Sequence, residues 1–168
     1  MTRLGYRLNF NIFNFFFLQV PINITEESSC NISARCATAE LLRQCKLLVI
    51  DEVTMAHRHV YEAIDRTLRD VRNDERPYGG LTTVFSGDWR QILPVIRKGS
   101  RADVVDACFK SSPLWQHVTV MKLTRNMRVA QSSQEGFEED TDFAEHLLEI
   151  GEGRVPVDKS LGQFKVRL

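Results

Sequence analysis

The sequence lacks an excess of charge of either sign, because 22 lysines and arginines balance 22 aspartates and glutamates. The whole-chain charge therefore gives no argument for a nucleic-acid partner, although a neutral total can still contain a local basic groove. Arg97, Lys98 and Arg101 form a local basic cluster that we expect to be a solvated loop.

The four cysteines show no C-x-x-C spacing, so we expect reduced thiols in an intracellular protein rather than a zinc site.

Long apolar runs are also scarce, and Leu8–Val20 (LNFNIFNFFFLQV) is the longest charge-free stretch in the first 20 residues. It is shorter than the roughly 20 apolar residues that span a bilayer, and it has no small-residue cleavage site of a secretory signal. We therefore expect no membrane segment. Residues 1–20 form an atypical N-terminal segment with two interpretations: a buried strand, or intron sequence carried into the reading frame. Transcript reads that run through codons 8–20 would contradict the second interpretation.

The stretch around which the chain is organised is Lys46–Glu52 (KLLVIDE), an apolar run followed by two carboxylates. Such a run is typical of a buried parallel strand, and ligands of open α/β sheets bind at the carboxyl ends of these strands. Asp51 would hold a magnesium ion directly or through water, and Glu52 would orient and deprotonate an attacking water. The alternative interpretation is a strand that ends in two solvated acids.

After residue 20, patterns typical of helices and strands alternate, which predicts an α/β fold with a parallel sheet flanked by helices. We expect helices over 37–44 (capped by Ser33 or Thr38), 57–72, 102–110 and 143–150, and strands over 46–50, 81–85 and 118–123. In the helix over 57–72, the apolar side chains with helical spacing are Val60, Ile64, Leu68 and Val71. Because polar residues follow each strand, a nucleotide or phosphate site is the leading hypothesis.

Two residues beyond the acids have candidate roles in that site. The Gln91 amide could donate to a γ-phosphate oxygen and accept from the attacking water, and Arg128 could stabilise charge on the transferring phosphoryl group. Each has a plainer alternative as a solvated loop residue. For Asp88 we expect a local hydrogen bond in a tight turn opened by Gly87, and for Trp89 we expect packing rather than contact with a base.

Four segments, in order, resemble motifs of the Pif-one family of DNA helicases, especially its plant and Helitron-transposon relatives. They are PINITEESSCNIS (21–33), which resembles the segment ahead of the acidic motif, LLVIDEVTMAHRHVYEAIDRTLRDV (47–71, motif II), GGLTTVFSGDWRQILPVIRKGSR (79–101, motif III) and LTRNMR (123–128, motif IV). The resemblance implies a RecA-like P-loop NTPase fold and a 5′-to-3′ ATP-dependent DNA helicase of superfamily one.

By this resemblance, Asp51 carries magnesium, Glu52 activates water, Gln91 senses the γ-phosphate and Arg128 contacts it. The implied partners are ATP and single-stranded or forked DNA, the implied location is the nucleus, and the implied processes are DNA repair, recombination or telomere maintenance. Residues 21–123 would belong to a partial first RecA-like domain, and residues 124–168 would start a second motor domain that is cut off.

The sequence departs from the family at one essential element, because G-x-x-x-x-G-K-[ST] occurs nowhere in it. This loop cradles the phosphates with its backbone amides and neutralises them with its lysine. We therefore expect the chain alone not to turn over ATP. Two alternatives follow: a non-catalytic, transposon-derived remnant, which the missing loop favours, or another P-loop ATPase, which the G-D-x-R-Q-I-L-P pattern of residues 87–94 disfavours.

Overall fold

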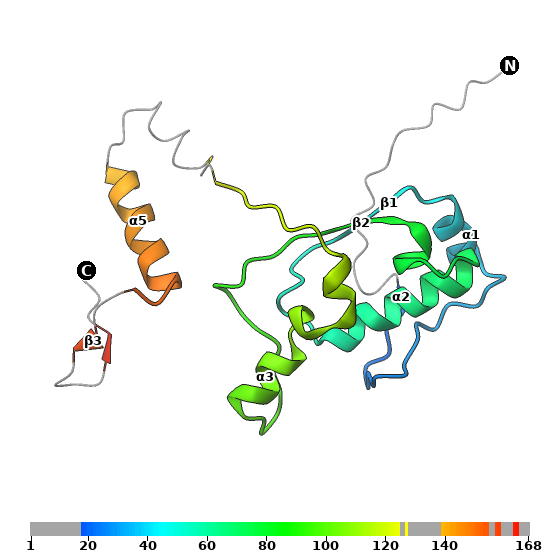
Figure 1. Ribbon diagram of the computed structural model, residues 1–168, viewed down its shortest axis with the longest axis horizontal. Helices are drawn as coiled ribbons and strands as arrows, with labels where there is room; N and C mark the ends of the chain where they lie inside the picture. The colour runs from blue at the N-terminus through cyan, green and yellow to red at the C-terminus, as the bar shows by residue number, and fades with distance from the viewer. Residues whose placement is uncertain (1–17, 125–126, 128–138, 155–156, 159–162, 165–168) are drawn as a thin grey trace, which may run out of the picture. The chain divides into compact units, whose positions relative to one another are not determined.

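The computed structural model describes residues 18–124, 127, 139–154, 157–158 and 163–164 (Figure 1). The chain divides into two compact units, Met1–Val118 and Thr119–Leu168, which we describe separately. The first unit contains, in order, α1 (Ala37–Gln44), β1 (Leu47–Ile50), α2 (Arg58–Arg72), the 3₁₀ turn η1 (Pro77–Gly80), β2 (Thr82–Phe85), α3 (Arg101–Ala107), η2 (Phe109–Ser111) and η3 (Pro113–His117).

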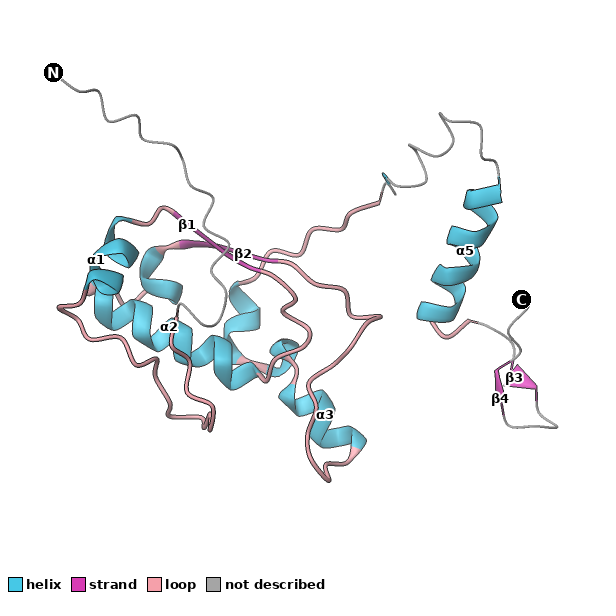
Figure 2. Ribbon diagram, turned by 180° about the vertical axis from the view of Figure 1, so that it is seen from behind, coloured by secondary structure: helices cyan, strands magenta, loops and turns pink. Residues whose placement is uncertain are grey.

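A parallel pair of strands, β1 and β2, lies alongside α2 in the first unit (Figure 2). Leu47 lies opposite Thr82 and Ile50 lies opposite Phe85, so the two strands end at the same edge. The connection between them is α2, which lies along one face of the pair. This βαβ arrangement is the one that the alternating sequence pattern predicted, and parallel strands require such a crossover.

The amphipathic pattern of α2 is confirmed, because Ile64, Leu68 and Val71 are all buried at helical spacing. His57 precedes the first turn and accepts a hydrogen bond from the backbone N–H of His59. The helix ends at Asn73, which adopts the left-handed conformation that commonly terminates helices. The apolar face of α2 and the buried side chains of β1 belong to one core cluster, to which α1 contributes Ala39 and Leu42 and η2 contributes Phe109.

The turn η1 is fastened to α2 by side chains of that helix. The buried Asp65 carboxylate accepts from the backbone N–H of Tyr78 at 2.6 Å and pairs with Arg69 at 2.8 Å. Arg72 donates from Nε to the Gly79 carbonyl at 2.7 Å, and from Nη1 to the Leu42 carbonyl at the end of α1, also at 2.7 Å. Because only Leu81 separates η1 from β2, these bonds help to set where β2 begins.

Two sequence-based expectations for local structure are wrong. The cap of α1 is neither Ser33 nor Thr38 but Cys36, whose sulfur accepts from the Ala39 N–H at 3.4 Å. Residues 118–123 form no strand, although they are described; Met121 is 85% exposed and Leu123 is fully exposed. Strand-forming side chains make a strand only where a neighbouring strand can satisfy their backbone groups, and the described sheet extends no further than β1 and β2.

The second unit contains α5 (Glu139–Gly151), β3 (Val157–Asp158) and β4 (Gln163–Phe164), and β3 pairs antiparallel with β4. The expected helix over 143–150 is present within α5. Its apolar side chains are largely exposed, including Phe143 at 61% and Leu147 at 50%. Arg128 lies outside the described residues, so its predicted role is not addressed by this geometry.

Candidate functional site at the carboxyl ends of β1 and β2

The backbone pairing of the two strands continues one step beyond their ends. The Ser86 N–H donates to the Ile50 carbonyl at 2.9 Å, and the Val53 N–H donates to the Ser86 carbonyl, also at 2.9 Å. The turn after β1 and the turn after β2 therefore start side by side. This confirms the expectation that both strands deliver polar groups to the same edge of the sheet.

Asp51 is the residue at which the two turns meet. Its Oδ1 accepts from the Glu52 backbone N–H at 3.0 Å and from the Ser86 hydroxyl. Asp51 and Glu52 are both exposed to solvent. Glu52 has φ of +53°, a conformation that is uncommon outside glycine and costs free energy, and such residues cluster at functional sites.

A side chain of α2 bonds to the turn that carries the two acids. The Tyr61 side chain is fully buried, and its hydroxyl donates to the Val53 carbonyl at 2.9 Å. The Tyr61 ring packs on Phe109 with 4.8 Å between centroids, and Phe109 packs on Phe85 at the end of β2, again at 4.8 Å. One aromatic cluster thus supports the ends of both strands.

This arrangement leads us to expect a loss of stability at alkaline pH. Burial raises the pKa of the Tyr61 hydroxyl above its ordinary value of 10.0, against a smaller lowering by the Ala56 backbone. The folded chain then keeps a proton that the unfolded chain loses, so this contribution is fully present below pH 10.0 and is lost as pH rises above it. In urea unfolding experiments, the free energy of unfolding of the wild type should fall steeply above that pH.

The matched variant is Tyr61→Phe, which keeps the ring and removes the titrating group. We expect it to be less stable at neutral pH by about 1 kcal/mol, from the lost hydrogen bond, and to show a shallower alkaline decline. Burial also raises the pKa of Tyr78, so some decline persists in both proteins. Identical alkaline slopes for the wild type and the variant would contradict this account of Tyr61.

The polar loop after β2 is a tight turn closed on itself. Asp88 accepts from the Arg90 backbone N–H at 3.0 Å and from Arg90 Nε at 2.9 Å, and its carbonyl accepts from the Gln91 N–H at 3.0 Å. These bonds from Arg90, with a smaller one from the Gln91 side chain, lower the pKa of the Asp88 carboxyl. The local role expected for Asp88 is therefore confirmed.

Gln91 follows Ser86 in this loop and is exposed. No hydrogen bond joins Gln91 to Asp51 or Glu52 in the part of the chain that the structure describes. Trp89 is half-buried and packs edge-on to Trp115 at 6.1 Å, with Lys110 Nζ 4.4 Å from its ring centroid. The packing role expected for Trp89 is confirmed, and it fixes one end of the loop that carries Gln91.

The acid pair suits a magnesium ion that takes most of its ligands from substrate and water. It does not suit a metal site built from protein ligands alone. Within the described residues, no three His, Cys, Asp or Glu side chains are grouped to hold a metal. Mg²⁺ takes oxygen ligands and commonly uses one or two protein carboxylates, with substrate phosphates and water completing its octahedron. Asp51, solvent-exposed at the sheet edge, is a donor of this type.

Ser86 is the site residue that the sequence interpretation missed. From the sequence alone it is only one of several polar residues that follow the second expected strand. The available signal was the register: if two parallel strands end level, the first residue beyond one lies beside the first residue beyond the other. Applied to Ile50 and Phe85, this rule places Ser86 beside Asp51.

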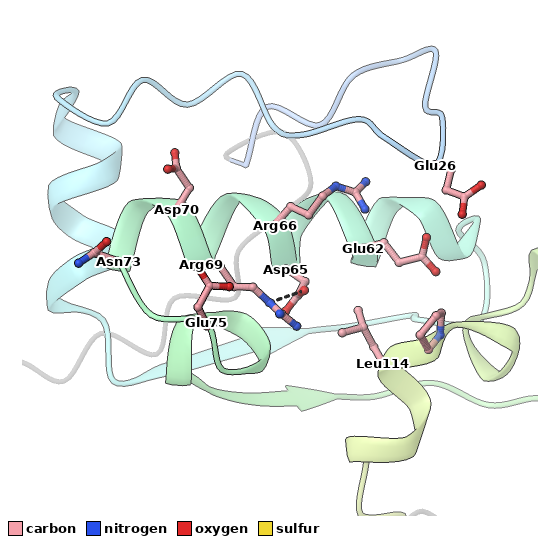
Figure 3. Close-up of a pocket in the computed structure, with 10 residues that line it drawn as sticks. Glu26, Glu62, Asp65, Arg66, Arg69, Asp70, Asn73, Glu75 and Leu114 are labelled. Atoms are coloured by element: carbon pink, nitrogen blue, oxygen red, sulfur yellow. Dashed lines mark ion pairs between the residues drawn. The ribbon is translucent and has the colours of Figure 1, made fainter.

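A surface pocket of about 590 Å³ runs along α2, and it is separate from the candidate site at the ends of β1 and β2 (Figure 3). Its charged groups are of both signs, and several of them bond within the chain: Arg69 pairs with Asp65, and Arg66 Nε donates to the Ser28 carbonyl at 2.9 Å. None of Asp51, Glu52 or Gln91 lines it. The lining residues are Glu26, Glu62, Asp65, Arg66, Arg69, Asp70, Asn73, Glu75, Pro113 and Leu114.

Comparison with known proteins identifies relatives over most of the chain. A family model described as PIF1-like helicase matches residues 11–160. The ATP-dependent DNA helicase PIF1 of Candida albicans is 28% identical over 121 residues, which are 69% of this chain and 13% of that protein. Human ATP-dependent DNA helicase PIF1 is 33% identical over 90 residues, which are 53% of this chain and 14% of that protein.

Among solved structures, a crystal structure of Bacteroides sp. Pif1 in complex with ADP-AlF4 is similar with a TM-score of 0.62 and 25% identity. The similarity covers 85% of this chain and 33% of that one. It confirms the expected RecA-like α/β fold, of which β1, α2 and β2 form a part. No helix among the described residues is long and apolar enough to cross a membrane.

Proposed function

Because this chain belongs to the PIF1-like helicase family, we propose that it supplies the acidic part of the ATPase site of an ATP-dependent DNA helicase. The observation that carries the proposal is the meeting of Asp51 with Ser86 where β1 and β2 end, with Glu52 next in sequence. The chain spans only 13% to 14% of the length of the two curated relatives above. ATP hydrolysis and DNA unwinding are therefore proposed for a whole protein that contains this segment.

In the proposed mechanism, each named residue has one task. Asp51 would hold Mg²⁺, which supplies positive charge to the β- and γ-phosphates when bound. Glu52 would accept a proton from the water that attacks the γ-phosphorus. The Gln91 amide would donate to a γ-phosphate oxygen, and the Arg128 guanidinium would stabilise charge developing on the phosphoryl group.

The wider assignments are part of the same proposal. Residues 21–123 would belong to the first RecA-like motor domain and residues 124–168 to the start of the second. Single-stranded or forked DNA would be the nucleic-acid partner and the nucleus the compartment, with repair, recombination or telomere maintenance as the process. Family membership supports these assignments.

A chimeric helicase tests the proposed function. The matched 121 residues of the Candida albicans relative are replaced by the corresponding residues of this chain, so that the host supplies the phosphate loop. We expect magnesium-dependent ATP hydrolysis that single-stranded DNA stimulates. A chimera that is folded by circular dichroism and binds nucleotide but shows no turnover would contradict the proposal.

The second candidate is a non-catalytic role for this segment, which does not itself contain G-x-x-x-x-G-K-[ST]. It differs from the first in one result. In a degenerate copy the acids also lose their function, so a folded chimera that is inactive although the host supplies the phosphate loop would support this candidate. An active chimera would show that the acids still work, and a coding sequence with G-x-x-x-x-G-K-[ST] ahead of this segment would exclude the candidate.

A further inference from the structure

We propose that Ser86 is a positioning residue, whose hydroxyl orients the Asp51 carboxylate so that Oδ2 faces the divalent cation of the nucleotide. This inference rests on the proposed function, since it concerns how Asp51 performs its task. The hydroxyl donates to Asp51 Oδ1, and the Glu52 backbone N–H donates to the same oxygen at 3.0 Å. Two donors on one oxygen restrict rotation of the carboxylate and leave the other oxygen for a cation.

The backbone of Ser86 is itself held on both sides by the segment that carries Asp51. Its N–H donates to Ile50, the residue before Asp51, and its carbonyl accepts from Val53, two residues after. Both distances are 2.9 Å. The hydroxyl is thus anchored to the same backbone whose side chain it orients, so the two cannot drift apart without breaking the parallel pairing.

The residue after Ser86 makes the approach of the two turns close. A Cβ added to Gly87 would lie 3.1 Å from Val53 Cγ1 and 3.2 Å from both the Val53 nitrogen and Thr54 Cγ2. Val53 and Thr54 are buried, so little room exists for relaxation. The close packing of the turns holds the Ser86 hydroxyl within reach of Asp51.

The orientation of Asp51 matters because the described residues group no three metal-binding side chains that could share the task. A single exposed carboxylate that rotates freely loses conformational entropy when it binds a cation. A hydrogen-bonding partner that restricts the carboxylate beforehand lowers this entropic cost of binding. Hydrogen-bonding partners of metal ligands typically contribute about 10- to 100-fold in metal affinity or activity.

The test uses the full chain, labelled with ¹⁵N, and Mn²⁺ alone as the probe. Mn²⁺ broadens amide signals near its site, so broadening at Glu52, Val53 and Gly87 reports binding at Asp51 without nucleotide or turnover. We expect Ser86→Ala to raise the Mn²⁺ Kd about 10-fold. Ser86→Thr keeps a hydroxyl, so its Mn²⁺ Kd should stay close to that of the wild type. Asp51→Asn should abolish the broadening at Glu52, Val53 and Gly87.

The variants must keep the strand pairing, which unchanged amide shifts from 47 to 50 and from 82 to 85 would verify. Equal Kd for Ser86→Ala and wild type, a Ser86→Thr variant as weak as Ser86→Ala, or no broadening at Glu52 in the wild type would each overturn the positioning role. An inactive chimera together with hydroxyl-dependent Mn²⁺ binding would refute the proposed function and leave the role of Ser86 intact.

Discussion

Glu52→Gln in the chimeric helicase is expected to lower kcat for ATP by about 10³-fold, within the range that general-base catalysis contributes. Glutamine keeps the shape of glutamate and its hydrogen-bonding oxygen, but its amide cannot accept the proton of the attacking water. Nucleotide affinity should stay close to that of the parent chimera, because Asp51 and the phosphate loop of the host would still bind the substrate. Single-turnover hydrolysis and equilibrium nucleotide binding separate the two quantities.

The matched control is Glu27→Gln, which makes the same chemical change at an exposed loop position away from β1 and β2. It should leave both kcat and nucleotide affinity unchanged. If Glu52→Gln kept more than about a tenth of the turnover, Glu52 would not be the base, because loss of a general base costs at least about 10²-fold. Another carboxylate in the chimera would then have to accept the proton.

Gly79→Ala is expected to destabilise the chain by about 3 kcal/mol, the size of effect that a steric clash added to a strained backbone produces. Gly79 has φ of +60°, and a Cβ there would lie 2.5 Å from the Leu68 carbonyl oxygen and 2.9 Å from Arg72 Cδ. The oxygen belongs to the backbone of α2 and cannot move aside without unwinding the helix. The turn would have to separate from α2, losing the bond from Arg72 to the Gly79 carbonyl.

Gly80→Ala is a closely matched control, because Gly80 has φ of +65° in the same turn. An added Cβ there would meet the Arg76 guanidinium at 2.5 Å, and that exposed side chain can swing away. The Cβ would also lie 2.8 Å from Asp74 Oδ2, so the exposed Asp74–Arg76 ion pair must shift with it. We expect a cost of about 1 kcal/mol, from the backbone conformation and this exposed pair. Urea unfolding of both variants measures the difference, and equal destabilisation would mean that contact with α2 does not hold the turn.

The helix α2 and the two strands were predictable because each has a periodic signal in the sequence. Residues such as Ile64 and Leu68 recur at helical spacing, and their burial depends only on one face meeting the sheet. The run that becomes β1 is short and apolar, and the acids after it mark where it ends. These features are local, so one sequence is enough to read them.

The failed expectations depend on groups distant in sequence or on unusual chemistry. Cys36 caps α1 through its sulfur, whereas helix-capping preferences favour hydroxyl side chains such as those of Ser33 or Thr38. Residues 118–123 have strand-like composition, yet a strand needs a pairing partner that composition does not reveal. In both cases the deciding partner cannot be identified from the local pattern.

The candidate site was predictable in its acids but not in its assembly. Asp51 and Glu52 stand out because two carboxylates directly follow an apolar run. Ser86 does not stand out, because one serine after a strand is common and its meaning comes from the register of β2 against β1. The chemistry of its amide makes Gln91 a candidate, and the structure places it in a turn closed by Asp88 and Arg90.

The most direct test of the central claim is the position of the metal. Crystals of the chimera grown with ADP-AlF4 and Mn²⁺ would locate the ion by its anomalous signal. We expect Mn²⁺ within about 4.5 Å of the Asp51 carboxylate, bound directly or through one water, at the carboxyl ends of β1 and β2. An ion held by other side chains, with Asp51 facing bulk solvent, would contradict the assignment of this edge of the sheet as the nucleotide site.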